Sequence, residues 1–274
     1  MFGLQNFGRL GSSGRVAALP SLIAQLFTPG TVGFCGGMSV TEAYDNGWLF
    51  ADDAGTTPAA LNGPVGLVLG QVGSINASQT TSTKRPTLKD DGSGHLYLEF
   101  DGTDDCFVTP SIDLTGTDKV TVFAGVRKLS TSLGVICEFS ADPDVGDGRF
   151  AVYSEYPSAN DYSFYAHGAG GESVASFAHI AAAPPDSAVL TGTSDLLTQV
   201  NTIRRNGVDG TDNTSTWTPS MFANEPLYIG SRNQSAIFFN GRMYTLPIIV
   251  GRTVEPALIL EVEAAINAAM GGIY

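Results

Sequence analysis

The sequence has few charged residues, and basic residues are the scarcer kind. Its 274 residues include 27 Asp and Glu but only 14 Lys and Arg, which gives a formal net charge of −13. A protein that binds the nucleic-acid backbone needs a basic stripe that releases counterions, and an anionic membrane surface requires the same charge. We therefore expect no nucleic-acid partner and no membrane partner.

Cysteine and long apolar runs are scarce as well. Cys35, Cys106 and Cys137 lie far apart and form no C-x-x-C pair, which predicts neither a disulfide framework nor a zinc site. No run approaches the roughly 20 apolar residues that span a bilayer. We expect folding in a reducing cytosol.

Common catalytic and cofactor motifs are also missing. The sequence contains no G-x-S-x-G nucleophile motif, no Walker A motif and no dinucleotide fingerprint, and we expect no cofactor. One loop places Asp142, Asp144 and Asp147 close together around glycines, and clustered carboxylates of this kind are calcium ligands. The spacing differs from that of an EF-hand, so a solvated hairpin loop is the alternative that we favour over a calcium site.

What the sequence does contain is a series of short strand patterns between turns. From residue 95 to 250 at least nine short strand-like segments lie between turns, and those at 96–100 and 120–127 alternate. The whole chain has 33 glycines, a number typical of turn-rich all-β domains. Asn206-Gly207 is a strong hairpin turn because both residues tolerate positive φ. This pattern predicts an all-β fold, a two-sheet antiparallel jelly-roll sandwich. The expected strands are 65–69, 96–100, 120–127, 133–139, 149–153, 162–166, 188–191, 199–204, 227–230 and 242–250.

The two ends of the chain differ from this pattern. Residues 1–39 are rich in glycine and serine and predict an irregular N-terminal arm with a short helix near 20–27, which docks on another protein or is simply frayed. Residues 40–274 form the predicted jelly roll, which one C-terminal helix at 256–270 closes. The apolar residues expected to dock are Phe2, Leu4, Phe7, Leu10, Leu22, Leu26 and Phe27.

An ordered set of motifs resembles a known family. The motifs are RPTL at 85–88, YLEFDGTDD at 97–105, RNGV at 205–208, LYIG at 227–230 and FNGRMY at 239–244. In this order they resemble the concanavalin A-like, laminin-G-type jelly rolls of tailed-phage and prophage structural proteins. The resemblance implies a virion component that has no enzymatic activity and often carries a glycan-binding surface.

A tyrosine cluster is the predicted carbohydrate-binding site. Tyr153, Tyr156, Tyr162 and Tyr165 lie within thirteen residues, beside Asn160. Sugar rings stack on aromatic faces while amide and carboxylate groups bind their hydroxyls. Core packing explains the same residues, with Tyr153 and Tyr165 pointing inward and Tyr156 in the loop.

Glu99 and Asp101 suggest a second chemistry. Residues i and i+2 of a strand point to one side, and the segment resembles the paired carboxylates of concanavalin A-like glucanases. In the non-catalytic family an Asp at this place caps a turn by accepting backbone amide hydrogen bonds. We favour this structural role over catalysis.

These observations combine into one functional interpretation. We expect a non-enzymatic tail fibre or appendage subunit of a phage virion, which attaches through its N-terminal arm to other virion proteins and binds host-surface glycans. We also expect a homo-oligomer, for which a trimer fits an appendage. The alternatives are a capsid decoration protein that stabilises the head and, less favoured, a glycan-cleaving hydrolase that uses Glu99 and Asp101.

Overall fold

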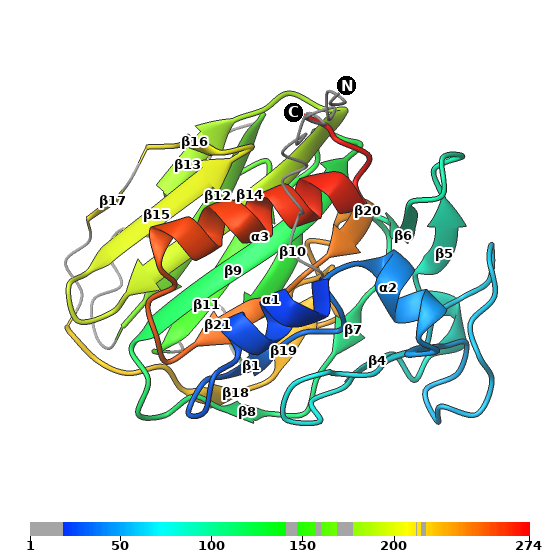
Figure 1. The fold of residues 1–274 in the computed structure, drawn as a ribbon, viewed down its shortest axis with the longest axis horizontal. Helices are drawn as coiled ribbons and strands as arrows, with labels where there is room; N and C mark the ends of the chain where they lie inside the picture. The colour runs from blue at the N-terminus through cyan, green and yellow to red at the C-terminus, as the bar shows by residue number, and fades with distance from the viewer. Residues whose placement is uncertain (1–18, 141–146, 157–159, 169–177, 212, 215–217) are drawn as a thin grey trace, which may run out of the picture.

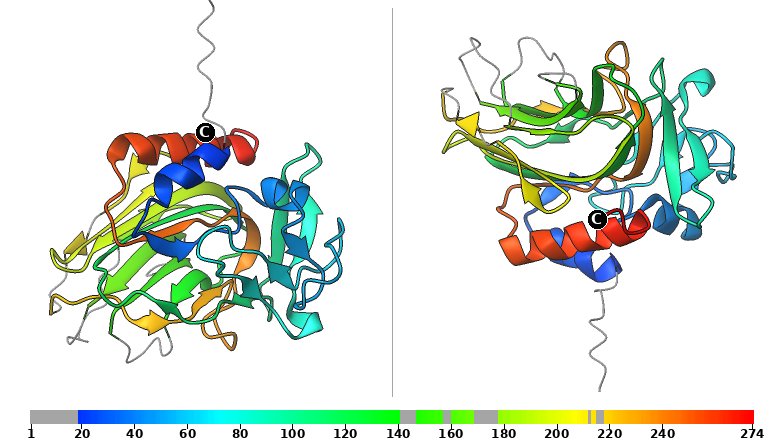
Figure 2. Two further views of the ribbon diagram at one scale, coloured as in Figure 1. Left: turned by 60° about the horizontal axis from the view of Figure 1, so that its bottom comes forward. Right: turned by 90° about the horizontal axis from the view of Figure 1, so that it is seen from above.

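A computed structural model describes residues 19–140, 147–156, 160–168, 178–211, 213–214 and 218–274. The described residues form two large antiparallel sheets packed face to face, with helices along one side (Figures 1 and 2). The predicted all-β jelly-roll sandwich is confirmed. No helix among the described residues is both long and apolar enough to cross a membrane.

The first sheet contains ten strands in the described residues, and β9 lies at its centre between β14 and β20. Its strands are β1 (Val32–Phe34), β5 (Thr87–Asp90), β6 (Leu96–Asp101), β9 (Lys119–Lys128), β14 (Asp186–Asp195), β15 (Val200–Arg205), β16 (Val208–Asp209), β17 (Asn213–Thr214), β20 (Asn240–Thr245) and β21 (Ile248–Val250).

The second sheet contains nine strands in the described residues, in the order β13-β12-β11-β10-β19-β7-β4-β3-β2. Its strands are β2 (Leu49–Phe50), β3 (Leu67–Val68), β4 (Ala77–Ser78), β7 (Phe107–Val108), β10 (Gly134–Phe139), β11 (Arg149–Ser154), β12 (Asp161–His167), β13 (Ala178–Ala181) and β19 (Leu227–Ile229). A small third sheet joins β8 (Ile112–Asp113) to β18 (Asn224–Glu225).

The first sheet is apolar on both faces. Along β9, Val122 and Ala124 pack into the main core between the sheets, whereas Phe123 between them faces the helices. This alternation follows from the two-residue period of a strand. The middle of β9, from Val122 to Val126, is therefore a continuous apolar run, as expected for a strand that is buried on both sides.

Helices α1 (Leu19–Leu26) and α3 (Pro256–Ala269) cover the outer face of the first sheet (Figure 2). α3 begins with a proline, which suits the first helical turn, and buries Val262 and Ile266 against the sheet. Glu263 on α3 is also buried; it accepts a hydrogen bond from the Thr191 hydroxyl (2.7 Å) and pairs with Arg204 (3.0 Å). The predicted closing helix is confirmed.

Part of the expected N-terminal arm belongs to the packed domain. Leu22 and Leu26 of α1 are fully buried in the cluster beneath the helices, and Phe27 is half-buried there. β1 pairs with β21 at the side of the first sheet. The boundary expected after residue 39 therefore does not coincide with the edge of the core, which includes residues from Leu22 onward.

The remaining helices are short and lie in the lead-in to the sandwich. They are α2 (Val40–Asp45) and the 3-10 helix η1 (Ser82–Lys84). α2, which the sequence analysis missed, begins with a capping box: the Ser39 hydroxyl accepts from the Glu42 amide (3.0 Å), and the Glu42 carboxylate accepts from the Met38 amide (2.7 Å).

Backbone bridges join the two sheets at both lateral edges. On one side, His179 of β13 and Thr211 exchange two hydrogen bonds of 3.1 and 2.9 Å. On the other side, Leu88 of β5 donates to Gly63 (2.9 Å), and Val65 donates to Pro86 (2.8 Å). At these positions the edge strands β13 and β5 therefore have partners for backbone groups that an open edge would expose.

A buried ion pair links the two sheets at one end of the sandwich. Lys128 ends β9, Glu155 follows β11, and both side chains are 1% exposed where they pair. The Lys128 ammonium also lies 4.4 Å from the centre of the Tyr162 ring and donates to the Asp161 carbonyl (3.3 Å). Burial lowers the pKa of Lys128, and Glu155 opposes this shift.

We predict that removing one member of this pair is more harmful than removing both. Glu155→Gln leaves the Lys128 charge buried without a counter-ion and should lower the free energy of unfolding by about 3 kcal/mol or more. The double variant Lys128→Met/Glu155→Leu should regain most of that loss. Urea denaturation of the three proteins measures the difference, and equal stability of wild type and Glu155→Gln would contradict the prediction.

Candidate functional site

The outward side of the second sheet carries an unusual set of polar and aromatic residues. Phe150 of β11 and Phe164 of β12 point into the main core, so the residues that alternate with them point outward. Across the strand pairs, Arg149 of β11 lies opposite His167 of β12. The small Ala151 of β11 lies between Glu138 of β10 and Tyr165 of β12. We call the set the outer β10–β12 face; its members are Glu138, Ser140, Arg149, Tyr153, Tyr165, His167 and Arg232.

Arg232 crosses one half of this face. Its Nε donates to a Glu138 carboxylate oxygen (3.0 Å), and its Nη2 donates to the Tyr153 hydroxyl (2.7 Å). The guanidinium carbon lies 5.7 Å from the centre of the Tyr153 ring. Burial, and then the Glu138 charge, raise the pKa of Tyr153. Tyr153 therefore stays a protonated hydroxyl at neutral pH.

Arg149 repeats this arrangement on the other half of the face. Its Nε donates to the Tyr165 hydroxyl (3.3 Å), and its guanidinium carbon lies 5.7 Å from the centre of the Tyr165 ring. The rings of Tyr165 and His167 stack with their centres 6.1 Å apart. Each tyrosine of the face therefore has its own arginine.

A small cavity of about 10 Å³ opens between these groups. This volume is close to that of a single water-sized group. Its lining contains both polar and aromatic side chains. The lining residues are Glu138, Ser140, Arg149, Phe150, Ala151, Tyr153 and Tyr165.

The loop that supplies Arg232 has a strained backbone. Asn233, Gln234 and Ile237 all have positive φ, at 47°, 54° and 52°. This region is unfavourable for a β-branched residue such as Ile237, whose carbonyl accepts a hydrogen bond from Val135 of β10 (3.0 Å). Such strain persists where the surrounding structure fixes the loop, and it recurs at ligand sites.

The structure divides the predicted tyrosine cluster. Tyr153 and Tyr165 belong to the outer β10–β12 face, and the half-buried Tyr156 packs against Tyr153 with ring centres 5.3 Å apart. Tyr153 and Tyr165 are nonetheless buried, with 5% and 7% exposed, because they pack with Val135 and Ala151 in a small hydrophobic cluster outside the main core. The packing alternative therefore holds for these two tyrosines, although they do not point between the sheets. Tyr162 is the buried core residue, where it lies under Lys128, and Asn160 is exposed in the turn before β12.

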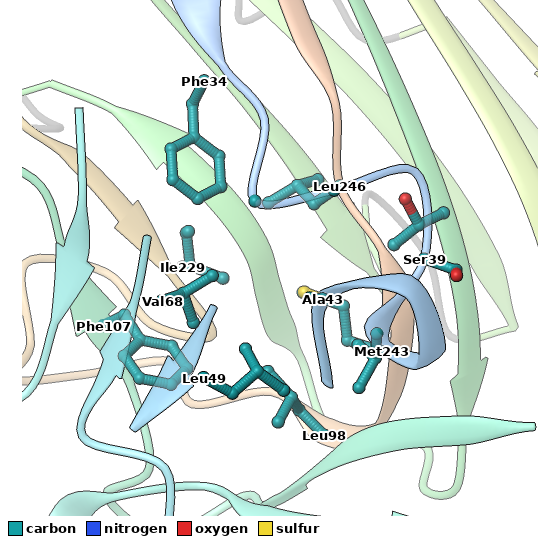
Figure 3. A pocket seen from close by; sticks show the side chains of 14 residues that line it. Phe34, Ser39, Ala43, Leu49, Val68, Leu98, Phe107, Ile229, Met243 and Leu246 are labelled. Carbon is teal, nitrogen blue, oxygen red and sulfur yellow. The ribbon is translucent and has the colours of Figure 1, made fainter. Parts of the chain in front are cut away.

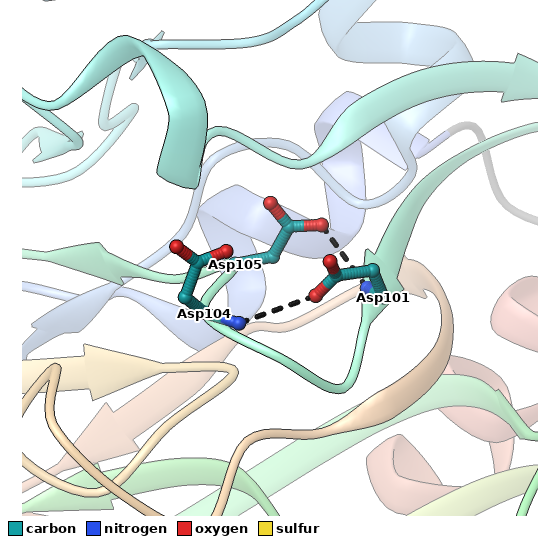
Figure 4. Close-up of side chains that lie close together, drawn as sticks. All are labelled: Asp101, Asp104 and Asp105. Atoms are coloured by element: carbon teal, nitrogen blue, oxygen red, sulfur yellow. Dashed lines mark hydrogen bonds between the residues drawn. The ribbon is translucent and has the colours of Figure 1, made fainter.

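Glu99 and Asp101 lie on one side of β6, as predicted, but Asp101 has a structural role. Its carboxylate accepts hydrogen bonds from the Thr103 amide (2.7 Å) and the Asp104 amide (3.3 Å), and its own amide donates to Asp105 (3.0 Å) (Figure 4). The turn-capping role that we favoured for this Asp is present. Asp101, Asp104 and Asp105 have carboxylate oxygens within 4.8 Å of one another.

The predicted calcium loop lies mostly outside the described residues. This applies to Asp142 and Asp144, whereas Asp147 is described and exposed. The calcium site therefore stays a prediction. The acidic group at Asp101, Asp104 and Asp105 is a different one, and its hydrogen bonds explain it as a turn.

Of the residues predicted to dock on another protein, some lie outside the described residues and others lie in the core. Phe2, Leu4, Phe7 and Leu10 lie outside the described residues. Leu22 and Leu26 have exposed fractions of 0% and lie in this chain's own core. These two leucines are therefore not available to another protein.

Another cavity among the described residues is apolar. It measures about 50 Å³ and lies between α2 and strands of both sheets (Figure 3). Phe34, Val40, Leu98, Phe107 and Ile229 are among its lining residues. Few polar groups converge on it, so it lacks the orienting contacts of a specific binding site.

Sequence reasoning missed Glu138, Ser140, Arg149, His167 and Arg232. For four of these a signal exists: each sits at the outward position of a strand pattern whose inward neighbours are Phe139, Phe150 and Ala166. Arg232 carries no such signal, because it reaches the face from a loop.

Comparisons with known proteins give similarity in structure only. No protein-family model matches the chain, and no curated protein sequence matches it. A Trypanosoma rangeli sialidase in complex with 2,3-difluorosialic acid is similar, with a TM-score of 0.51 and 13% identity over 76% of this chain and 32% of that chain. The botulinum neurotoxin serotype G binding domain is similar with a TM-score of 0.51 and 12% identity, covering 72% of this chain and 47% of that chain.

A third similar structure is the binding domain of botulinum neurotoxin DC in complex with SialylT, with a TM-score of 0.50 and 9% identity over 74% of this chain and 48% of that chain. The chain spans less than half the length of each of these proteins. At these identities the likeness defines the fold class, a concanavalin-like jelly-roll β-sandwich. The fold part of the resemblance is thereby confirmed, and its phage part stays a prediction.

One expectation needs correction. We expected a protein without enzymatic activity, partly because the jelly-roll resemblance implied it. The similar structures include a sialidase, which is a glycosidase, beside toxin binding domains. The inference from this architecture to the absence of catalysis is therefore wrong.

Asp105 gives a pH-dependent prediction. Burial first, and then the carboxylates of Asp101 and Asp104, raise its pKa to about 6 despite the Asp101 amide hydrogen bond. The native state thus binds this proton more tightly than the unfolded chain, so stability should rise as pH falls through about 6. Asp105→Asn keeps an acceptor oxygen and should stabilise the protein at pH 7 by about 2 kcal/mol.

Urea unfolding at pH 7 and pH 5 measures this effect. The Asn variant should lose the gain in stability that the wild type shows at the lower pH. Asp113→Asn is the control, because hydrogen bonds from Thr115 lower the pKa of that exposed carboxylate, the opposite direction. The raised pKa of Asp105 would be contradicted if the free energy of unfolding of the wild type fell between pH 7 and pH 5 while that of Asp105→Asn stayed the same.

Proposed function

We propose that this protein binds glycans through the outer β10–β12 face. The observation that carries the proposal is the pairing of Tyr153 with Arg232 and of Tyr165 with Arg149 around a small cavity. The described helices pack on the first sheet, so none of them covers this face (Figure 2).

The chemistry of the face suits carbohydrate. Sugars present apolar ring faces and a rim of hydroxyls, so aromatic rings beside fixed charged groups bind them. Glu138 supplies hydrogen-bond acceptors, the two arginines supply donors, and the tyrosine hydroxyls supply both. The contacts among these side chains hold them in place before a ligand arrives, which reduces the entropy lost on binding.

The similar structures support this choice of ligand class. One is a sialidase in complex with a sialic acid derivative, and another is a toxin binding domain in complex with SialylT. Both names indicate a carbohydrate ligand. We therefore propose a carbohydrate ligand for this chain because of the shared fold. We propose the outer β10–β12 face as the binding site because of its residues.

The biological setting is the second part of the proposal. The ordered motifs that resemble phage jelly rolls support a virion protein in a tail appendage, in which several copies present the face to a host surface. Mass spectrometry of purified phage particles, with electron microscopy of the same sample, tests this setting. Copies in multiples of three at the tail would support it, a regular pattern on the head would favour capsid decoration, and absence from particles would reject both.

Glycan binding predicts the effect of removing two hydroxyls. Tyr153→Phe/Tyr165→Phe deletes the acceptors of Arg232 and Arg149 but keeps both rings, and it should weaken glycan binding by about tenfold or more. An array that displays neutral and acidic oligosaccharides at high density measures the binding. Tyr97→Phe/Tyr244→Phe is the matched control, since these two buried tyrosines lie on the opposite outer face, under the helices.

The control should bind as the wild type does. Failure of the wild-type protein to bind any displayed glycan would refute the proposed function. Equal binding by the wild type and Tyr153→Phe/Tyr165→Phe would move the site to another part of the molecule.

A further inference from the structure

We propose that the small cavity on the outer β10–β12 face is a subsite for one hydroxyl group of an uncharged sugar. The hydroxyl would lie among Glu138, Ser140 and Arg149, which line the cavity together. This inference rests on the proposed glycan-binding function and specifies the class of glycan.

The size of the cavity determines how much of a ligand enters it. A volume of about 10 Å³ accepts one water-sized group and excludes a sugar ring. A glycan at this face therefore inserts a single substituent, and its ring stays outside. The half-buried Tyr156, whose ring packs against that of Tyr153, lies beside this site and offers the ring an aromatic neighbour.

The groups that line the cavity determine the chemistry of that substituent. An ionised Glu138 only accepts hydrogen bonds, and Arg149 only donates them. A group that lies between them makes the most of both when it can donate and accept at once. Among the common substituents of sugars, the hydroxyl does this with a single atom of the required size.

Ser140 is an independent sign of a ligand. Its side chain is 2% exposed, and its hydroxyl oxygen has no hydrogen-bond partner among the residues that the structure describes. A buried polar group without a partner is costly and calls for an explanation. A ligand hydroxyl in the cavity would provide the partner, because Ser140 lines the same space.

The same arrangement disfavours charged substituents. A carboxylate would meet the Glu138 carboxylate as well as the Arg149 guanidinium, and an amine would meet Arg149, and Arg232 behind Glu138, as well as Glu138 itself. Either charge therefore loses to repulsion part of what it gains from its opposite charge, while it still loses its hydration. Like charges close together in a desolvated site oppose binding. The subsite therefore selects neutral sugars, in contrast to the acidic sugars named with the similar structures.

The experiment compares neutral glycans with acidic partners, of which one carries an added sialic acid residue and the other replaces a hydroxymethyl group by a carboxylate. Wild-type protein is titrated against immobilised lactose and sialyllactose, and against immobilised cellobiose and its glucuronic acid counterpart. We expect the neutral member of at least one pair to bind about tenfold more tightly than its acidic partner. Ser140→Ala should weaken binding of that neutral glycan by about three- to tenfold, the effect of losing one hydrogen bond.

Ser163→Ala is the matched control. Ser163 is a fully buried serine that lies on the same side of β12 as Tyr165, but it does not line the cavity. Circular dichroism melting of both variants checks that each is folded. Removing one hydroxyl leaves the Glu138–Arg232 pair in place, so the fold is retained in the test.

The possible outcomes separate the two proposals. Preference for acidic glycans, or unchanged binding by Ser140→Ala, overturns the hydroxyl subsite, while glycan binding at the face stands if Tyr153→Phe/Tyr165→Phe still loses affinity. Absence of binding to every displayed glycan by the wild type overturns the proposed function and this inference together.

Discussion

The alternation of side chains along β10, β11 and β12 is the constraint on which both the core and the candidate site depend. Successive residues of a strand point to opposite faces, so the same three strands supply Phe139, Phe150 and Phe164 to the core and the polar residues of the outer β10–β12 face to the other side. A shift of one residue in register would exchange these two sets. The burial of the phenylalanines therefore fixes the position of the charged residues.

The sequence predicts much of the fold because the fold rests on this same period. The β6, β9 and β12 patterns appear in the sequence as runs or alternations of apolar residues, and the structure has strands there. The Asn206-Gly207 turn is present with positive φ at both residues. Two-residue strands such as β4 and β7 are too short for a period to be detected, so their pairing depends on contacts distant in sequence.

The candidate site was predictable only in part. Tyrosine clustering indicated Tyr153 and Tyr165, but it also included Tyr162, because composition does not distinguish the two sides of a strand unless its register is known. The contribution of Arg232 depends on a loop whose left-handed residues include Ile237, which local sequence preference disfavours. The fold imposes that conformation, so reading the sequence residue by residue does not find it.

Many of the scarce basic residues pair with acids of this chain. Among the described residues, Lys or Arg side chains that form ion pairs with carboxylates include Arg85, Lys119, Lys128, Arg204, Arg205 and Arg232. Glu138, Glu155 and Glu263 are their buried partners. Each of these three buried glutamates therefore lies beside a cation, whereas the buried Asp105 lies beside other carboxylates and has a raised pKa.

The bridges that join the two sheets at their lateral edges have a consequence for crowded arrangements of this protein. At His179 of β13 and Leu88 of β5, neighbouring copies held close together meet backbone groups that already have partners. Strand-by-strand polymerisation, the usual hazard of densely packed β-proteins, therefore has less of a template at these two strands. Copies concentrated on one surface are protected at these places from pairing through their backbones.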